Sequence, residues 1–224
     1  NYADITFEKK IIGLPDGNLD LTDHSNRDYF TAPEAIDSDH PLGQVTPSAL
    51  PPLEEEVKVN SVDIHARVKI DKSSISDTLL GTVIHQIICS YNPVATDSVQ
   101  TITQQLKMYE LQEVVSAEWM LKSIQALYQY VDGGIIHKEL PLTGIMPDGK
   151  KVSGYIDMVV EQEDGLILVD HKTFSAEEGD LTAKARSHSG QLALYQDILQ
   201  KTLGKPVTKT CIYFVFEGKI VELL

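Results

Sequence analysis

The pattern of hydrophobic and polar positions changes period several times along the chain, and its most informative stretch covers residues 151–173. Residues 151–162 carry apolar and β-branched side chains typical of strands, and residues 166–169 are apolar throughout. With Glu-Asp-Gly at positions 163–165, the pattern predicts a hairpin. Three charged residues interrupt it: Asp157, Asp170 and Lys172. Because a buried carboxylate is costly without a partner or a metal, these residues indicate a site.

Helices are predicted where apolar residues recur every three or four positions. This spacing covers the region from residue 77 to about 88, then residues 97–107, 109–131 and 189–203. Strand patterns cover residues 135–140, 208–216 and 219–224, and the polar residues 174–188 are expected to form a mobile segment. This order of elements predicts an α/β (α+β) fold with a central mixed β-sheet flanked by helices.

Residues 1–60 differ in composition from the rest of the chain. They contain many turn-forming residues and 12 of the 33 acidic residues, but only 4 of the 19 basic ones. We interpret them as a short strand and an irregular linker, followed by one folded domain at residues 61–224. Within the linker, Thr46-Pro47-Ser48 has the pattern of a capped helix start. Because the chain starts without methionine and has no signal sequence or membrane-length apolar run, we expect a soluble fragment of a longer protein.

Charge and cysteine content exclude several kinds of protein. The net charge of −14 and the pI of about 4.8 argue against a protein that holds nucleic acid by bulk electrostatic attraction. They are compatible with contact to phosphate through a bound divalent metal. Cys89 and Cys211 are too few for a zinc ribbon or a four-cysteine iron–sulfur cluster.

The two acids of the hairpin suit a divalent metal. Asp157 and Asp170 lie on neighbouring strands, so their carboxylates can converge as oxygen ligands of Mg²⁺ or Mn²⁺. Lys172 shares the face of Asp170, where its ammonium can stabilise a pentacovalent phosphorane or orient the attacking water. His171 is expected to point to the opposite face, which leaves its backbone carbonyl as a further ligand. An isolated Asp-x-Lys string is most often a surface ion pair, but this one ends an apolar strand.

Two predicted helices add polar residues to this picture. Gly81 and His85 are four residues apart on the first helix, and from the residues alone His85 is either a core histidine or a ligand. Gln191 and Tyr195 have the same spacing on the helix at 189–203, so both can face the edge of the sheet.

Four short motifs, taken in order, resemble the RecB-like nucleases of the PD-(D/E)xK superfamily. They are Gly-Thr-Val-Ile-His at 81–85, Gly-Tyr-Ile-Asp at 154–157, Val-Asp-His-Lys-Thr at 169–173 and Gln-Leu-Ala-Leu-Tyr at 191–195. The match covers about residues 79–216, and Thr46-Pro47-Ser48 resembles the segment that enters this domain in AddA-type bacterial helicase-nucleases. The resemblance implies a restriction-endonuclease-like core with an added helical lobe, with residues 1–60 as the end of a helicase region. His171 replaces the usual tyrosine, and the missing four cysteines favour the AddA type.

The resemblance also implies roles for individual residues. The metal ligands would be His85, Asp157, Asp170 and the backbone carbonyl of His171. Lys172 would be the catalytic lysine, and Gln191 and Tyr195 would be an accessory pair near the scissile strand.

The implied activity is Mg²⁺- or Mn²⁺-dependent hydrolysis of DNA, as an exonuclease in double-strand-break repair in the bacterial cytosol. The implied partners are DNA, the helicase region of the same chain and a second helicase-nuclease subunit. A catalytically silent nuclease fold that only binds DNA or docks a partner is the alternative, and it would have lost one of the two acids or the lysine, none of which is lost. An acidic interaction domain would leave the acid–lysine cluster unexplained.

Two further positions stay open in the sequence. Glu139, on the strand before the hairpin, either reaches the site or is a solvated edge residue. Lys184, Arg186 and His188 either contact DNA phosphates or belong to a solvated loop.

Overall fold

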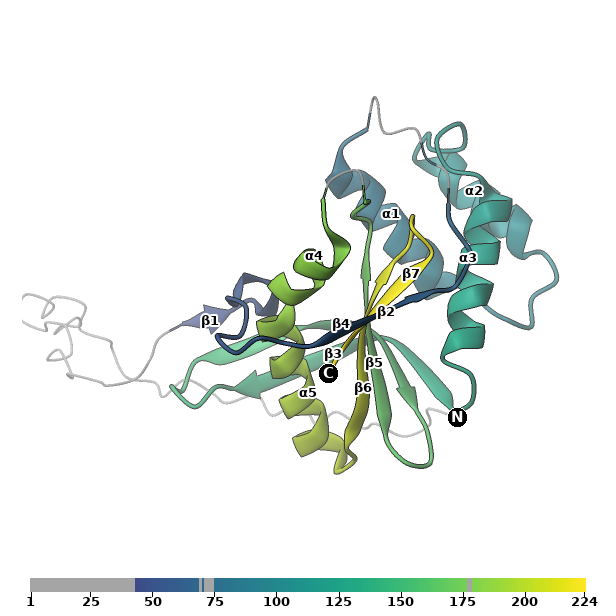
Figure 1. Cartoon of the computed structure of the whole chain (residues 1–224). Coiled ribbons are helices and arrows are strands. Elements are labelled where there is room, and N and C mark those ends of the chain that lie inside the picture. Colours follow the sequence, from purple (N-terminus) through teal and green to yellow (C-terminus); the bar gives the residue numbers. More distant parts are fainter. Residues whose placement is uncertain (1–42, 69, 71–74, 177–178) are drawn as a thin grey trace, which may run out of the picture. The chain divides into compact units, whose positions relative to one another are not determined.

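A computed structural model describes residues 43–68, 70, 75–176 and 179–224 (Figure 1). The short strand expected at the start of the chain and most of the expected linker lie outside these residues. The described residues contain one mixed sheet of seven strands in the order β1-β4-β5-β6-β7-β2, with β3 paired to β4. The strands are β1 (Gln44–Val45), β2 (Val59–Asp63), β3 (Ile135–Ile145), β4 (Lys151–Glu161), β5 (Leu166–Lys172), β6 (Val207–Phe214) and β7 (Lys219–Leu223). β1 runs parallel to β4 and β5 parallel to β6, while the other pairs are antiparallel.

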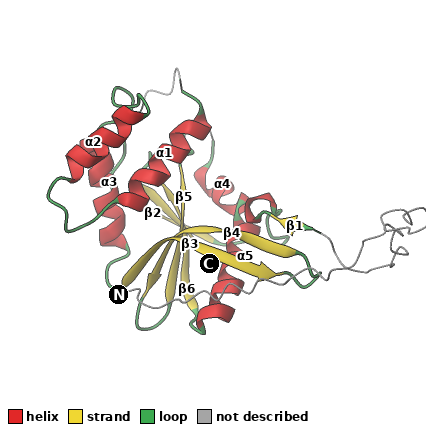
Figure 2. Cartoon of the chain, turned by 180° about the vertical axis from the view of Figure 1, so that it is seen from behind, coloured by secondary structure: helices red, strands yellow, loops and turns green. Residues whose placement is uncertain are grey.

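Helices cover both faces of the sheet, as Figures 1 and 2 show from opposite sides. They are α1 (Asp77–Ser90), α2 (Ser98–Met108), α3 (Ala117–Tyr130), α4 (Leu181–Ser187) and α5 (Ser189–Leu203). The first three share one buried cluster with the sheet, and α4 and α5 share a second cluster on the other face. The predicted central mixed sheet flanked by helices is therefore confirmed.

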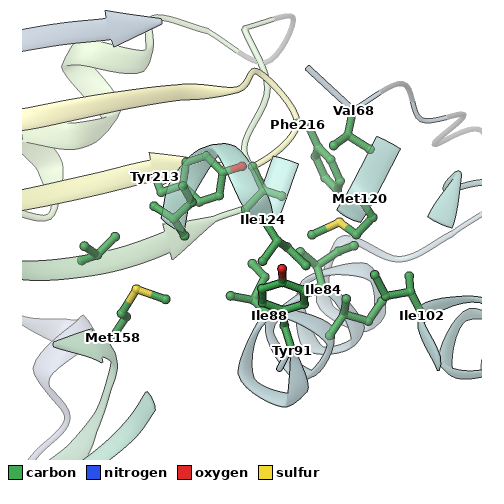
Figure 3. Close-up of a cluster of buried hydrophobic side chains, with 14 of the residues drawn as sticks. Val68, Ile84, Ile88, Tyr91, Ile102, Met120, Ile124, Met158, Tyr213 and Phe216 are labelled. Carbon is green, nitrogen blue, oxygen red and sulfur yellow. The ribbon is translucent and has the colours of Figure 1, made fainter. Parts of the chain in front are cut away.

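The larger cluster lies between α1, α2, α3 and the sheet (Figure 3). Ile84 and Ile88 of α1 meet Met120 and Ile124 of α3, and all four side chains are fully buried. Burial of each such side chain contributes about 1.5–3 kcal/mol to folding. This cluster holds α1 at a fixed height on the sheet, which places the residues on the exposed side of α1.

β5 lies at the centre of the sheet and is buried on both faces. Ile167 and Val169 pack toward α1–α3, and Leu166 and Leu168 pack toward α4 and α5. An apolar run without alternation is what a strand covered on both faces requires. Asp170 and Lys172, which end this strand, therefore start from a rigid position.

Helix α3 begins later than the spacing of apolar residues predicts. The predicted helix at 109–131 starts at Ala117, because the side chain of Ser116 accepts a hydrogen bond from the backbone N–H of Trp119 and caps the helix there. Upstream, Glu110 has a left-handed φ of 58° that ends the helical path. Apolar spacing alone does not detect such an interruption.

The segment predicted to be polar and mobile is partly helical, so that prediction is wrong for residues 181–187. Asp180 caps α4 by accepting a hydrogen bond from the N–H of Thr182. Leu181 and Ala185, four residues apart, are the buried residues of this helix. An apolar face of two small positions is too narrow for a periodicity argument to find.

The linker is more ordered than its turn-forming residues predict. β1 and β2 lie wholly or partly within residues 43–60, and Thr46-Pro47-Ser48 starts only a 3₁₀ helix, η1 (Pro47–Ala49), without a side-chain cap. In the described part of the chain, no helix has the length and apolar character needed to cross a membrane.

The N-terminus of α5 packs directly on the linker, and this contact predicts the effect of one substitution. A Cβ atom added at Gly190 would lie 1.9 Å from the carbonyl oxygen of Pro51. We expect Gly190→Ala to lower the free energy of unfolding by about 1–3 kcal/mol, because the backbone must shift to relieve the overlap. Chemical denaturation measures this change.

Gly81→Ala on α1 is the matched control. Its added Cβ would lie 3.5 Å from the Thr173 hydroxyl, an ordinary contact. The better helix propensity of alanine should leave stability unchanged or raise it by up to about 1 kcal/mol. An equal or larger gain for Gly190→Ala would show that α5 does not pack on Pro51 as described.

Candidate active site

The site forms where strands β4 and β5 separate. Their pairing ends at Met158 and Val169, immediately before Asp157 and Asp170. On the same edge of β4, β1 pairs only with Lys151 and Val152. The residues of β4 between these two pairings thus have no strand partner on this edge in the described structure, and side chains fill the gap.

Asp157 fills one end of the gap. Its Oδ2 accepts a hydrogen bond of 2.7 Å from the backbone N–H of His171 on β5. Its Oδ1 lies 3.5 Å from Nδ1 of His85. The carboxylate therefore replaces a missing ladder contact and also faces α1.

Gln191 and Tyr195 of α5 fill the other end. Gln191 Nε2 donates to Asp170 Oδ1 and to the Tyr195 hydroxyl, at 3.3 Å each. The Tyr195 hydroxyl donates to the backbone carbonyl of Tyr155 at 3.1 Å. Both side chains are buried, so the two residues that are four apart on α5 connect one strand of the site to the other.

Lys172 lies beside Asp170, on the same face of β5. Its Nζ is 2.7 Å from Asp170 Oδ2, and the Asp170 residue is only 4% exposed. An ion pair at this depth in the sheet is unlike a solvated surface pair, because one partner is desolvated almost completely.

His85 reaches the strands from α1. Its Nε2 lies 3.0 Å from the carbonyl oxygen of His171. Gly81, one turn earlier, brings the helix close to the end of β5, since a Cβ there would touch Thr173. His85 is half-buried and lines the site, so of the two readings left open by the sequence the structure favours a functional one over a core histidine.

The His171 side chain differs from its prediction. It was expected to point away from the site, but its Nδ1 lies 4.0 Å from Asp157 Oδ2. His85, Asp157 and His171 form a group whose potential ligand atoms all lie within 4.8 Å of one another. The reason is that Asp157 lies where β4 changes faces, so its carboxylate reaches the side on which the His171 ring packs.

The change of face involves Glu139 as well. In the β3–β4 ladder, Lys138 pairs with Met158 and Leu140 pairs with Ile156, while Glu139 between them has a left-handed φ of 49°. Met158 packs toward α1–α3 and Ile156 toward α4 and α5, although residues two apart on a regular strand share a face. The hairpin thus switches faces at the level of Glu139 and Asp157.

Glu139 lies in the site and is not a solvated edge residue. It lines a cleft of about 520 Å³ together with His85, Asp157 and other residues of α1. Burial raises the pKa of the Glu139 carboxyl above its usual value, and the negative charge of Asp157 adds to this. Sequence periodicity places residue 139 on a strand but does not show its left-handed backbone.

The basic residues of the 174–188 segment have other partners than expected for a free loop. Arg186 Nε donates to the carbonyl of Val57 at 3.1 Å, and Lys184 Nζ lies 5.2 Å from the centre of the Phe174 ring. Contact of Lys184 and Arg186 with DNA stays a prediction. Burial, followed by the charges of Lys172 and Lys184, lowers the pKa of His188 to about 4, so this ring lies near the catalytic lysine as a neutral group.

The environments of the two acids push their pKa values apart. Burial raises the pKa of Asp170 to about 6, although the charge of Lys172 opposes this. Burial acts in the same direction on Asp157, but hydrogen bonding to His85 and the nearby charge of His171 lower its pKa to about 2. Two close carboxylates with one lysine leave an excess of negative potential in a buried place.

The donor set fits a divalent cation. Carboxylate oxygens of Asp157 and Asp170, an imidazole nitrogen of His85 and the carbonyl oxygen of His171 face one region, and such mixed oxygen and nitrogen donors suit Mn²⁺ and Mg²⁺. A cation here would offset the cost of burying the Asp170 charge.

The fold and this arrangement of acids and lysine define a nuclease class, and comparison with known proteins agrees. Residues 63–222 match the model of the PD-(D/E)XK nuclease superfamily. The chain therefore belongs to this superfamily.

Similar proteins share one name, which describes them as ATP-dependent helicase/nuclease subunits. The relative from Alkaliphilus oremlandii is 25% identical over 85% of this chain, and the one from Bacillus mycoides is 25% identical over 68%. A relative from Thermoanaerobacter is 39% identical over 32% of this chain. The chain spans only 19%, 15% and 6% of the lengths of these relatives.

The bond from Tyr195 to the unpaired carbonyl of Tyr155 predicts a stability effect. We expect Tyr195→Phe to lower the free energy of unfolding by about 1–2 kcal/mol, because a buried carbonyl loses its donor. Denaturant unfolding followed by circular dichroism measures the change.

Tyr109→Phe is the matched control, because its hydroxyl donates to the exposed Gln86 side chain. Its effect should stay within about 0.5 kcal/mol. Equal losses in the two variants would mean that Tyr195 does not support the strand edge.

Proposed function

We propose that this chain is a metal-dependent nuclease domain that hydrolyses phosphodiester bonds of DNA. The observation that carries the proposal is the convergence of Asp157, Asp170, Lys172 and His85 at the point where β4 and β5 separate. Four charged or titratable side chains from three elements meet in a sheet that is otherwise apolar, which neither packing nor solubility requires.

The residues divide the chemistry between them. Asp157, Asp170, His85 and the His171 carbonyl would hold Mg²⁺ or Mn²⁺, which when bound supplies Lewis acidity and lowers the pKa of a coordinated water. Lys172, held by Asp170, places a positive charge where the phosphate becomes more negative as water attacks. Gln191 fixes the orientation of the Asp170 carboxylate, and Tyr195 in turn contacts Gln191, so both act near the scissile strand.

The wider role is also a proposal, supported by the names of the relatives. We infer that the domain acts as an exonuclease at the end of a helicase-nuclease, in double-strand-break repair in the bacterial cytosol. Residues 1–60 would then end a helicase region of the same chain, and a second helicase-nuclease subunit would be a partner. The names of proteins that share only part of their length with this chain support this inference.

Cleavage of linear DNA tests the activity. We expect the chain to cut single- or double-stranded DNA with Mg²⁺ or Mn²⁺, and to lose cleavage in EDTA. Lys172→Ala and Asp170→Asn should each reduce the rate at least about 100-fold, because each removes a charge needed at the reacting phosphate. Gel analysis of end-labelled DNA gives the rates.

Lys201→Ala is the control, because Lys201 pairs with Asp197 on the exposed side of α5. Its rate should stay within about twofold of the wild type. Cleavage that persists in both site variants would refute the assignment of the site. Tight DNA binding without cleavage under any metal would favour the silent nuclease fold.

Metal affinity tests the histidine ligand separately from activity. We expect His85→Ala to raise the dissociation constant for Mn²⁺ at least about tenfold, a loss typical even of residues that only support a ligand. Calorimetric titration measures it. His65→Ala, with a side chain that is 87% exposed, should bind Mn²⁺ like the wild type. Unchanged affinity in His85→Ala would remove His85 from the ligand set.

A further inference from the structure

One face of the β3–β4 hairpin beyond the site is open to solvent. In this part of the hairpin, alternate residues face α5. A Cβ added at Gly144 would lie 2.7 Å from Ile198 of α5, and one added at Gly154 would lie 3.2 Å from Pro47 of η1. Figure 2 shows the hairpin from the opposite side, with α5 behind it. The intervening residues therefore form a second, outer face.

The outer face is apolar and lacks acids. Its residues are Pro141, Thr143, Ile145, Lys151, Ser153 and Tyr155. Tyr155 is 63% exposed and Ile145 is 79% exposed, although both belong to regular strands. Among these six residues the only charge is that of Lys151, in a chain with a net charge of −14.

This face is continuous with the candidate active site. Tyr155 lies two residues from Asp157 on β4 and pairs with Pro141, which lies two residues from Glu139 on β3. Two residues along a strand span roughly 7 Å. The Tyr155 ring thus lies within about one nucleotide's reach of the acids.

The backbone of Tyr155 is held in place from the other face. Its carbonyl accepts the hydrogen bond from Tyr195, whose hydroxyl also contacts Gln191. An exposed aromatic ring on a fixed backbone loses little conformational freedom on binding. Sheet surfaces with exposed aromatic residues are a common platform for single-stranded nucleic acids, because every base offers a ring face for stacking.

We propose that Tyr155 stacks on a base of the single DNA strand whose phosphodiester lies at Asp157 and Asp170, with the outer face of the hairpin as its platform. The inference rests on the proposed nuclease function and adds a base contact to it. The absence of carboxylates on this face favours nucleic acid over a basic protein partner, and Lys151 offers a phosphate contact at its far end.

Binding of oligothymidylate, measured by fluorescence anisotropy without cleavage, tests this contact. The complete chain carrying Lys172→Ala serves as the parent, with Mn²⁺ present. Adding Tyr155→Ala should weaken binding roughly tenfold, whereas Tyr155→Phe should bind like the parent because the ring is kept. An oligonucleotide of the same length without bases should bind the parent and the Tyr155→Ala variant equally, because there is nothing to stack.

Trp119→Ala is the control for the loss of a partly exposed aromatic residue elsewhere, since Trp119 lies on α3 beside Lys122 and is 40% exposed. It should leave the affinity unchanged. Undiminished binding of oligothymidylate by Tyr155→Ala would overturn the proposal, and so would an equal loss for the abasic strand or a loss confined to duplex DNA.

The outcome is separable from that of the nuclease test. A chain that binds bases through Tyr155 but never cuts DNA would refute the proposed activity and support this contact. A chain that cuts DNA and is indifferent to Tyr155→Ala would do the reverse.

Discussion

The structure depends on a stretch of β4 that lacks a strand partner on one edge. β1 pairs with the start of this edge and β5 with its end, and the residues between them expose backbone groups that must find other partners. The Tyr195 hydroxyl satisfies the carbonyl of Tyr155, and the Asp157 carboxylate receives the N–H of His171. Polar side chains are therefore required here for the sheet to form, and the same side chains supply the chemistry.

This constraint explains why the acids tolerate their burial. The sheet is rigid on both sides of the gap, because β5 is covered by apolar clusters on both faces. Within it, Asp170 gains Lys172 and Gln191 as partners, while Asp157 gains His85 and a backbone N–H. The remaining excess of negative charge is what a divalent cation would neutralise, so stability and function meet at one point of the fold.

Much of this arrangement is readable from the sequence where periodicity and turn chemistry are strong. The helix predicted at 189–203 is confirmed with the same bounds, and so is the hairpin that carries Asp157 and Asp170. Predictions failed where one residue changes the path of the backbone. Glu139 takes a left-handed φ that no pattern of apolar residues reveals, and the resulting change of face also misplaced the side chain of His171. Helix α4 was missed because its buried face is too small.

The most direct test of the central claim is a crystal structure of the chain grown with Mn²⁺, with the ion located by its anomalous scattering. We expect one Mn²⁺ bound by Asp157, Asp170, His85 and the backbone carbonyl of His171, with Lys172 beside it. An ion bound elsewhere on the chain, or none at this site at saturating Mn²⁺, would contradict this claim.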